Sequence, residues 1–86
     1  MHAVVTRVSI SDPEAAQATL ESEVVPRVSQ APGFVAGHWV ALGEGKGTAV
    51  IVFDSEDAAR AAADRLQPPP SVSFDSVEVG EVVAQA

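Results

Sequence analysis

The sequence predicts a small α+β domain whose elements run strand, helix, strand, strand, helix, strand over residues 1–86. Three observations predict this order. Four segments have the alternation or the β-branched composition of strands, two others carry apolar residues at helical spacing, and a glycine-rich loop joins the second and third strands. A chain of 86 residues has the length of a single domain.

The beginning of the chain predicts a strand followed by a helix start. His2 to Ile10 alternates two sets of side chains, which places Arg7 on the opposite face from Val4. The run Ser11–Glu14 then resembles a helix N-terminus. Either its Ser and Glu form a capping box, or its Asp caps the helix and its Pro takes the first helical position.

The first helix carries one residue that conflicts with it. Apolar side chains recur every four positions from Ala16 to Val28, which predicts one apolar helix stripe. Pro26 lies inside this helix and removes one backbone donor. We therefore expect the helix to kink or to split into two pieces near residues 22–25. The run Ala31–Gly33 ends it.

The second strand is predicted from Phe34 to Leu42. Strict alternation would put Phe34 and His38 on one face and Trp39 on the other. His38 and Trp39 could then face the same small cavity only if a β-bulge intervened. The glycine-rich run Gly43–Gly47 predicts a hairpin loop after this strand.

The second half of the chain repeats the pattern. Thr48–Phe53 is predicted as a strand, and Asp54–Asp57 starts a helix with acids near its positive end. The apolar stripe Ala58–Leu66 is mostly Ala, so this helix can approach a sheet closely. Gln67–Ser71 stops it, and Val72–Ala84 forms the last strand. With right-handed crossovers this order gives the ferredoxin-like fold, a four-stranded antiparallel sheet with two helices on one face.

Both faces of the predicted sheet carry apolar side chains. Ala49–Phe53 is apolar throughout, and the second and last strands place apolar residues on both sides. Two helices can cover only one face, and a large exposed apolar face would be an aggregation hazard. We therefore expect a homodimer that pairs the open sheet faces about a two-fold axis. The alternative is a monomer with a patchily hydrophobic open face.

The composition argues against several classes of partner and site. Twelve acids against five bases give a formal charge of −7, which argues against nucleic acid and anionic membranes. The absence of Cys excludes a thiol nucleophile and a Cys-ligated metal site, and no two His lie at metal-ligand spacing. We expect no metal and no cofactor. No leader or membrane span is visible, which indicates a soluble cytoplasmic protein.

Two passages resemble one known family. The stretch Val25–Trp39, with Pro-Gly-Phe at its centre, resembles the helix-to-strand passage of the dimeric α+β barrel superfamily, which includes the antibiotic-biosynthesis-monooxygenase-like (ABM-like) proteins. Phe53–Ala59 resembles the matching passage from the third strand to the second helix. The resemblance implies a sheet-to-sheet dimer. It also implies chemistries found in that superfamily, such as cofactor-independent oxygenation, isomerisation, dehalogenation-related reactions and haem degradation.

The chain departs from the best-known members of that family. Monooxygenases of this type use Asn, Trp and sometimes Tyr around the substrate, and haem-degrading members need an axial His and typically an Asn. This chain has no Asn and no Tyr. Only His38 and Trp39 could take such roles. The resemblance therefore predicts the fold more strongly than it predicts any one reaction.

Four side chains are candidates for a ligand site. His38 could be a general base or a structural His at the dimer interface. Trp39 and Phe34 could stack on a flat ligand or belong to the core. Arg7 could bind a ligand carboxylate or pair with Glu78 or Glu81 on another strand or subunit.

These residues leave two functions open. One is a homodimeric barrel protein that binds a small apolar or aromatic ligand between the helices and the sheet, without catalysis. The other is a cofactor-independent monooxygenase or isomerase of phenolic or quinone-like substrates, with His38 as base, Trp39 or Phe34 packing the ring and Arg7 binding an anion. A cavity holding His38 and Arg7 together would favour the enzyme. Haem degradation is a third and more distant alternative.

Overall fold

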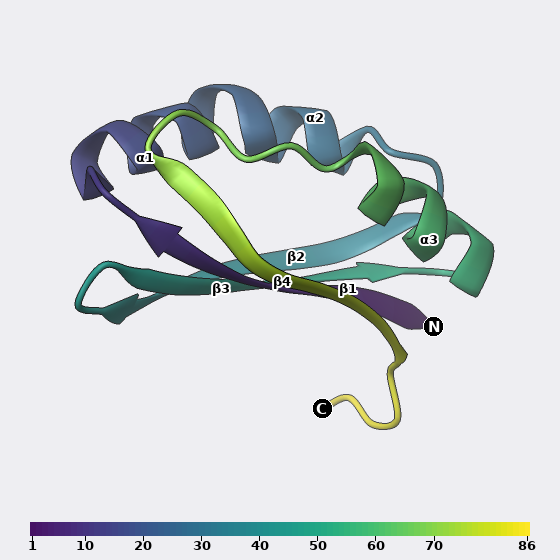
Figure 1. The fold of residues 1–86 in the computed structure, drawn as a ribbon. Coiled ribbons are helices and arrows are strands. Elements are labelled where there is room, and N and C mark those ends of the chain that lie inside the picture. Colours follow the sequence, from purple (N-terminus) through teal and green to yellow (C-terminus); the bar gives the residue numbers. More distant parts are fainter.

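The computed structural model describes residues 1–86 and has the predicted ferredoxin-like fold. Four antiparallel strands form one sheet in the order β2-β3-β1-β4 (Figure 1). They span His2–Ile10 (β1), Phe34–Gly43 (β2), Lys46–Phe53 (β3) and Val72–Glu81 (β4). All helices lie over one face of this sheet, and the other face carries none (Figure 1). No helix combines the length and the apolar character needed to cross a membrane.

The first helical arm begins at an Asp cap. The arm consists of α1 (Pro13–Thr19), a π-helical turn η1 (Leu20–Val24) and α2 (Val25–Ser29). The Asp12 carboxylate accepts a hydrogen bond from the Ala15 backbone N–H at 3.2 Å. Of the two predicted helix starts, the structure therefore selects the Asp cap with proline at the first helical position.

The disturbance predicted at Pro26 takes the form of a π-turn that divides the helix into two α-helical pieces, α1 and α2. Within η1 the hydrogen bonds reach back five residues, and the Val25 backbone N–H donates to the Leu20 carbonyl oxygen. Pro26 has no N–H for the Ser22 carbonyl, and in an α-helix its ring would crowd that carbonyl. The wider π-turn accommodates both effects and joins α1 to α2.

The third helix, α3 (Glu56–Arg65), covers the other end of the sheet. The Ser55 hydroxyl caps it by accepting from the Ala58 backbone N–H at 3.2 Å. On its exposed side the Arg60 guanidinium donates two hydrogen bonds to Glu56, at 2.7 and 2.9 Å. This hydrogen bond and the charge of Arg60 lower the pKa of the Glu56 carboxyl.

The core lies between the helices and the central strands β1 and β3. Val4 and Phe53 are fully buried there, and Ala59 of α3 has no exposed surface. The rings of Phe34 and Phe53 meet edge to face, with centroids 6.3 Å apart. The buried cluster comprises Val4, Val28, Ala49, Ile51, Phe53 and Ala59.

A β-bulge near the start of β2 changes the predicted face of one residue. Phe34 pairs with Phe53, but Ala36 pairs with Val52, so Val35 is an extra residue on β2. Phe34 therefore joins Trp39 on the helix-covered face, and the expectation that Phe34 and His38 share a face is wrong. Strict alternation fails here because two residues of β2 oppose one of β3.

The loop between β2 and β3 is a tight hairpin. Its two central residues, Glu44 and Gly45, have φ of 55° and 74°. Positive φ at both positions matches the right-handed twist of the flanking strands. Gly45 adopts this conformation freely, whereas Glu44 is strained in it.

The open sheet face mixes apolar and charged side chains. Val40 and Val50 lie on it and are 46% and 36% exposed. Ser9, Lys46 and Asp75 form a small exposed network, in which the Lys46 ammonium lies 3.4 Å from the Asp75 carboxylate. The open face thus carries exposed apolar side chains, with a polar cluster at one end.

Candidate functional site: a cavity between the helical arm and the sheet

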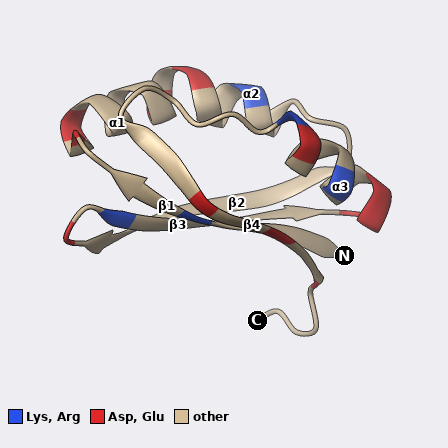
Figure 2. Cartoon of the chain, viewed as in Figure 1, with Lys and Arg blue, Asp and Glu red and all other residues tan.

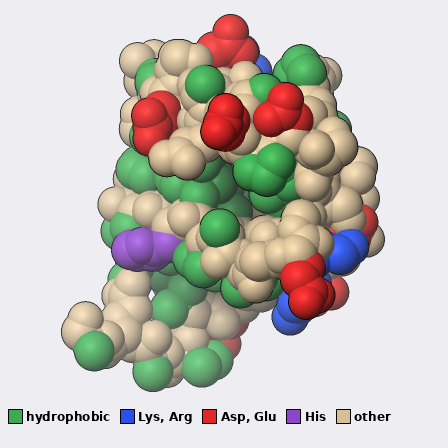
Figure 3. Space-filling model, turned by 90° about the vertical axis from the view of Figure 1, so that its left-hand side faces the viewer, with side chains coloured by type: hydrophobic (Ala, Val, Ile, Leu, Met, Phe, Trp, Pro, Cys, Tyr) green, Lys and Arg blue, Asp and Glu red, His purple; other side chains and the backbone are tan.

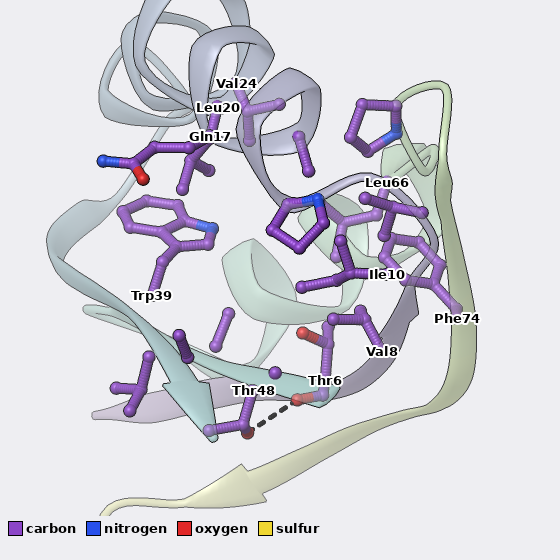
Figure 4. Close-up of a pocket in the computed structure, with 18 of the residues that line it drawn as sticks. Thr6, Val8, Ile10, Gln17, Leu20, Val24, Trp39, Thr48, Leu66 and Phe74 are labelled. Carbon is purple, nitrogen blue, oxygen red and sulfur yellow. Dashed lines mark hydrogen bonds between the residues drawn. The ribbon is translucent and has the colours of Figure 1, made fainter. Parts of the chain in front are cut away.

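The largest hollow in the molecule is a cavity of about 520 Å³ between the helical arm and the sheet. Its roof comes from α1 and η1 and its floor from β1, β2 and β3 (Figure 4). The connection between α3 and β4 closes one side through Gln67 and Pro69, together with Val72 at the start of β4. Most of the lining is apolar, including Val8, Ile10, Leu20, Val24, Ile51, Leu66 and Phe74.

Trp39 is the largest side chain that lines the cavity. It extends from β2 on the helix-covered face and is half-buried, with its ring below Gln17 of α1 (Figure 4). Gly37 leaves room for this ring, because a Cβ there would lie only 2.8 Å from the Trp39 ring. The indole therefore forms a flat apolar wall beside open space, a surface suited to stacking on a planar molecule.

The polar groups of the cavity are few and lack positive charge. The Thr48 hydroxyl donates to the Thr6 backbone oxygen at 2.7 Å, so its proton is already used. Gln17 and Gln67 offer amides, and Glu21 is the one charged residue of the lining. Figure 3 shows acidic side chains in a row above an apolar hollow at this end of the molecule. The site therefore favours neutral or cationic ligands over anions.

The four residues proposed from the sequence are divided between three places. Trp39 lines the cavity, whereas Phe34 packs on Phe53 in the core. Arg7 and His38 lie on the open sheet face and are exposed. Strand β3 separates them and the register offsets them by two residues, which corresponds to about 12 Å between their Cα atoms. The structure brings these two together on one face but outside the cavity.

Arg7 has no ion pair within the chain. The two salt bridges of the structure join Lys46 to Asp75 and Arg60 to Glu56. Pairing of Arg7 with Glu78 or Glu81 is thus absent in the single chain. The guanidinium is therefore unpaired on the open face.

Several lining residues were not singled out from the sequence. Leu20 and Val24 belong to the predicted apolar helix stripe, and Ile10 and Phe74 belong to predicted strand faces. Their patterns indicated the inward side correctly. What the patterns lacked was any sign that this part of the interior is packed loosely enough to leave a cavity.

A second, smaller cavity of about 320 Å³ lies between α2 and α3. Ile51 and Leu66 line both cavities and so form a common wall. No group of three or more His, Cys, Asp or Glu side chains is placed to hold a metal ion.

Comparison with solved structures identifies the fold. A variant of the protein MhuD with two manganese protoporphyrin IX molecules per active site matches with a TM-score of 0.68 and 18% identity, covering 100% of this chain and 98% of that one. A haem-free structure of a haem-degrading protein from Mycobacterium tuberculosis matches with a TM-score of 0.56 and 26% identity, covering 99% and 96%.

A third match is the haem degrader MhuD from the same organism with two haems in its active site. Its TM-score is 0.52 and its identity 25%, with coverage of 96% of this chain and 98% of that one. No family model and no curated protein matches the chain. The structural match to these haem-degrading proteins confirms the resemblance drawn from the sequence: the chain shares the ferredoxin-like fold of the ABM-like dimeric α+β barrel superfamily.

Proposed function

We propose that this protein is a homodimeric α+β barrel that binds a small, flat and mostly apolar molecule beside Trp39. The observation that carries the proposal is the cavity of about 520 Å³ with an indole ring along one wall. Cavities of roughly 300–1,000 Å³ with apolar walls and a few polar groups are typical of small-molecule sites. The lining here has the same character.

The ligand should be neutral or positively charged. Glu21 is the one charged lining residue, and neither Lys nor Arg reaches the cavity. An anion would therefore enter a site with no counter-charge, inside a chain of net charge −7. Gln17 and Gln67 could hydrogen-bond one or two polar atoms of such a ligand at the cavity edge.

Binding without catalysis is favoured over the enzyme alternative. A cofactor-independent monooxygenase or isomerase needs a base within hydrogen-bond reach of its substrate. His38 and Arg7 lie on the opposite sheet face from the cavity. They could serve a ligand only on the open face, where a second copy would have to complete the site.

Haem as the ligand is the second candidate, favoured by the matches to haem-degrading proteins at 25–26% identity. The donor set of this cavity does not fit an iron porphyrin well. No His lines it, and no cation is present to receive the propionates. A haem in this cavity would therefore lack an imidazole ligand from its walls.

The exposed apolar side chains of the open sheet face support the homodimer. Val40, Leu42 and Val50 are 46%, 56% and 36% exposed, and no helix covers them. Pairing this face with its copy would bury these side chains and place Arg7 and His38 at the interface.

Trp39 is the single Trp of the chain and so reports on the cavity directly. We would titrate the protein with 1,4-naphthoquinone and with haem while following Trp39 fluorescence, and record the Soret band for haem. Ala41 lines the cavity and is exposed, so Ala41→Phe should fill it without disturbing the core. Ala18→Phe, on the exposed side of α1, is the matched control.

The expected result is saturable quenching by naphthoquinone that weakens about tenfold or more in Ala41→Phe and persists in Ala18→Phe. Quenching that does not saturate, or that is equal in the two variants, would refute the proposed site. A shifted Soret band that saturates at one or two haems per chain and disappears in Ala41→Phe would favour haem instead.

A further inference from the structure

The second cavity arises from the small side chains of α3. Ala58, Ala61 and Ala62 face α2 and leave a hollow of about 320 Å³ over Val28 and Phe53. The sequence predicted that this alanine stripe would let the helix approach the sheet closely, and Ala59 does so with no exposed surface. Toward α2 the same small side chains leave space unfilled.

Two arginines lie at the rim of this hollow. Arg27 is in the last turn of α2, and Arg65 is in the last turn of α3. Figure 2 shows the basic position of α2 and the one at the end of α3 on the same side of the molecule. Both side chains are exposed and line the cavity, together with Gln30. No Asp or Glu is among the lining residues.

Neither arginine has a partner within the chain. The two salt bridges involve Lys46 and Arg60, and no side-chain hydrogen bond uses Arg27 or Arg65. The chain as a whole is acidic, with twelve acids and five bases. The lining of this cavity has the opposite charge, because it contains two unpaired guanidinium groups and no acid. A guanidinium binds a carboxylate through two parallel N–H···O bonds.

We propose that the cavity between α2 and α3 binds a small amphipathic carboxylate. Its apolar body would lie among the alanines over Val28 and Phe53, and its carboxylate would meet Arg27 and Arg65. A volume near 320 Å³ lies at the lower end of the range for ligand sites, which selects a short apolar body. Its two arginines do not line the cavity beside Trp39, although Ile51 and Leu66 form a wall common to both cavities.

The two cavities then differ in the charge they accept. The cavity beside Trp39 has one acid and no base, and the α2–α3 cavity has two bases and no acid. The overall charge of −7 repels anions. Binding of an anion in the α2–α3 cavity would therefore have to come from the two arginines and the shape of that cavity.

Amide chemical shifts in NMR spectra test the proposal. Octanoate is the probe, and octylammonium, with the same chain and the opposite charge, is its control. Octanoate should shift amides of α2 and α3 in a saturable way, and the double substitution Arg27→Gln and Arg65→Gln should weaken it about tenfold. Arg60→Gln, on the same helix but outside the cavity, should leave the affinity unchanged.

Three results would overturn the proposal. One is equal binding of octanoate and octylammonium. The second is unchanged octanoate affinity in the double variant. Both side chains are exposed, so this variant should keep the fold, and circular dichroism checks that it does. The third is a pattern of shifts centred on Leu20 and Trp39, which would place octanoate in the other cavity.

Discussion

Replacing Val50 with Asp should dissociate the proposed homodimer while each chain keeps its fold. Val50 lies in the middle of β3 on the open face, where it pairs with Val5 of β1 and His38 of β2. It is 36% exposed in the single chain and does not belong to the buried core. A charge at this position therefore meets water in the monomer and the partner sheet in the dimer.

Two contributions to the free energy of association can be compared. Burying a whole Val side chain is worth about 1.5–3 kcal/mol, so burying the exposed third of Val50 gives about 0.5–1 kcal/mol per copy. The two-fold axis doubles this to about 1–2 kcal/mol per dimer. An unpaired carboxylate buried in the interface costs several kcal/mol for each copy. The charge therefore dominates, and Val50→Asp should raise the dissociation constant about 1,000-fold or more.

Light scattering on a sizing column, repeated over a range of protein concentrations, measures the effect. Val50→Ala should weaken the dimer only about 5- to 30-fold, since it loses the apolar contribution alone. Ala18→Asp, on the exposed side of α1, should remain dimeric. A monomeric parent protein would refute the proposal that a second copy covers the open face. A dimeric Val50→Asp variant would show that the copies meet elsewhere.

Three further substitutions test local features of the structure. Glu44→Asn should raise the free energy of unfolding by about 0.5–1 kcal/mol, because Asn tolerates the positive φ of this turn position, and the melting temperature should rise by a few degrees. Asp12→Ala removes the cap of α1 and should lower the free energy of unfolding by about 1 kcal/mol in urea titrations, whereas Asp12→Asn should retain most of it. Arg60→Gln should raise the pKa of Glu56 toward its ordinary value, as read from an NMR titration of that carboxyl. Since the folded pKa of Glu56 is lowered, the pair stabilises the fold above the unfolded pKa and loses its effect as the pH falls through the folded value, and an unchanged titration would contradict the role of Arg60.

The element order was predictable because each element carries its own local signal. The start of α1 at Pro13 follows from the Asp cap, and the hairpin at Glu44–Gly45 follows from its glycines. These signals depend on neighbouring residues only, and neighbouring residues are what a sequence displays. The expected residue ranges of the strands differ from the structure mainly at the ends, as for β4, which stops at Glu81.

The departures have a different origin. Val35 looks like any strand residue, yet it is the extra residue of a bulge that turns Phe34 toward the core. Pro26 indicates a disturbed helix, but the sequence does not choose between a kink, a break and a π-turn. Each choice is made by packing against elements distant in sequence. The candidate site was predictable only in part, because it also depends on packing between distant elements. Alternation indicated that Trp39 faces away from His38, but it carries no information on how much space lies beside the ring.

The wall shared by the two cavities has a thermodynamic consequence. Ile51 is 2% exposed and held in the centre of the sheet, whereas Leu66 follows the last turn of α3 and is only half-buried. A molecule that displaces Leu66 from one cavity changes the volume of the other. Any such coupling is reciprocal, so each occupant would alter the affinity for the second by the same factor. Through the rotamer of one leucine, the occupancy of a site for neutral or cationic rings would depend on the supply of a small acid.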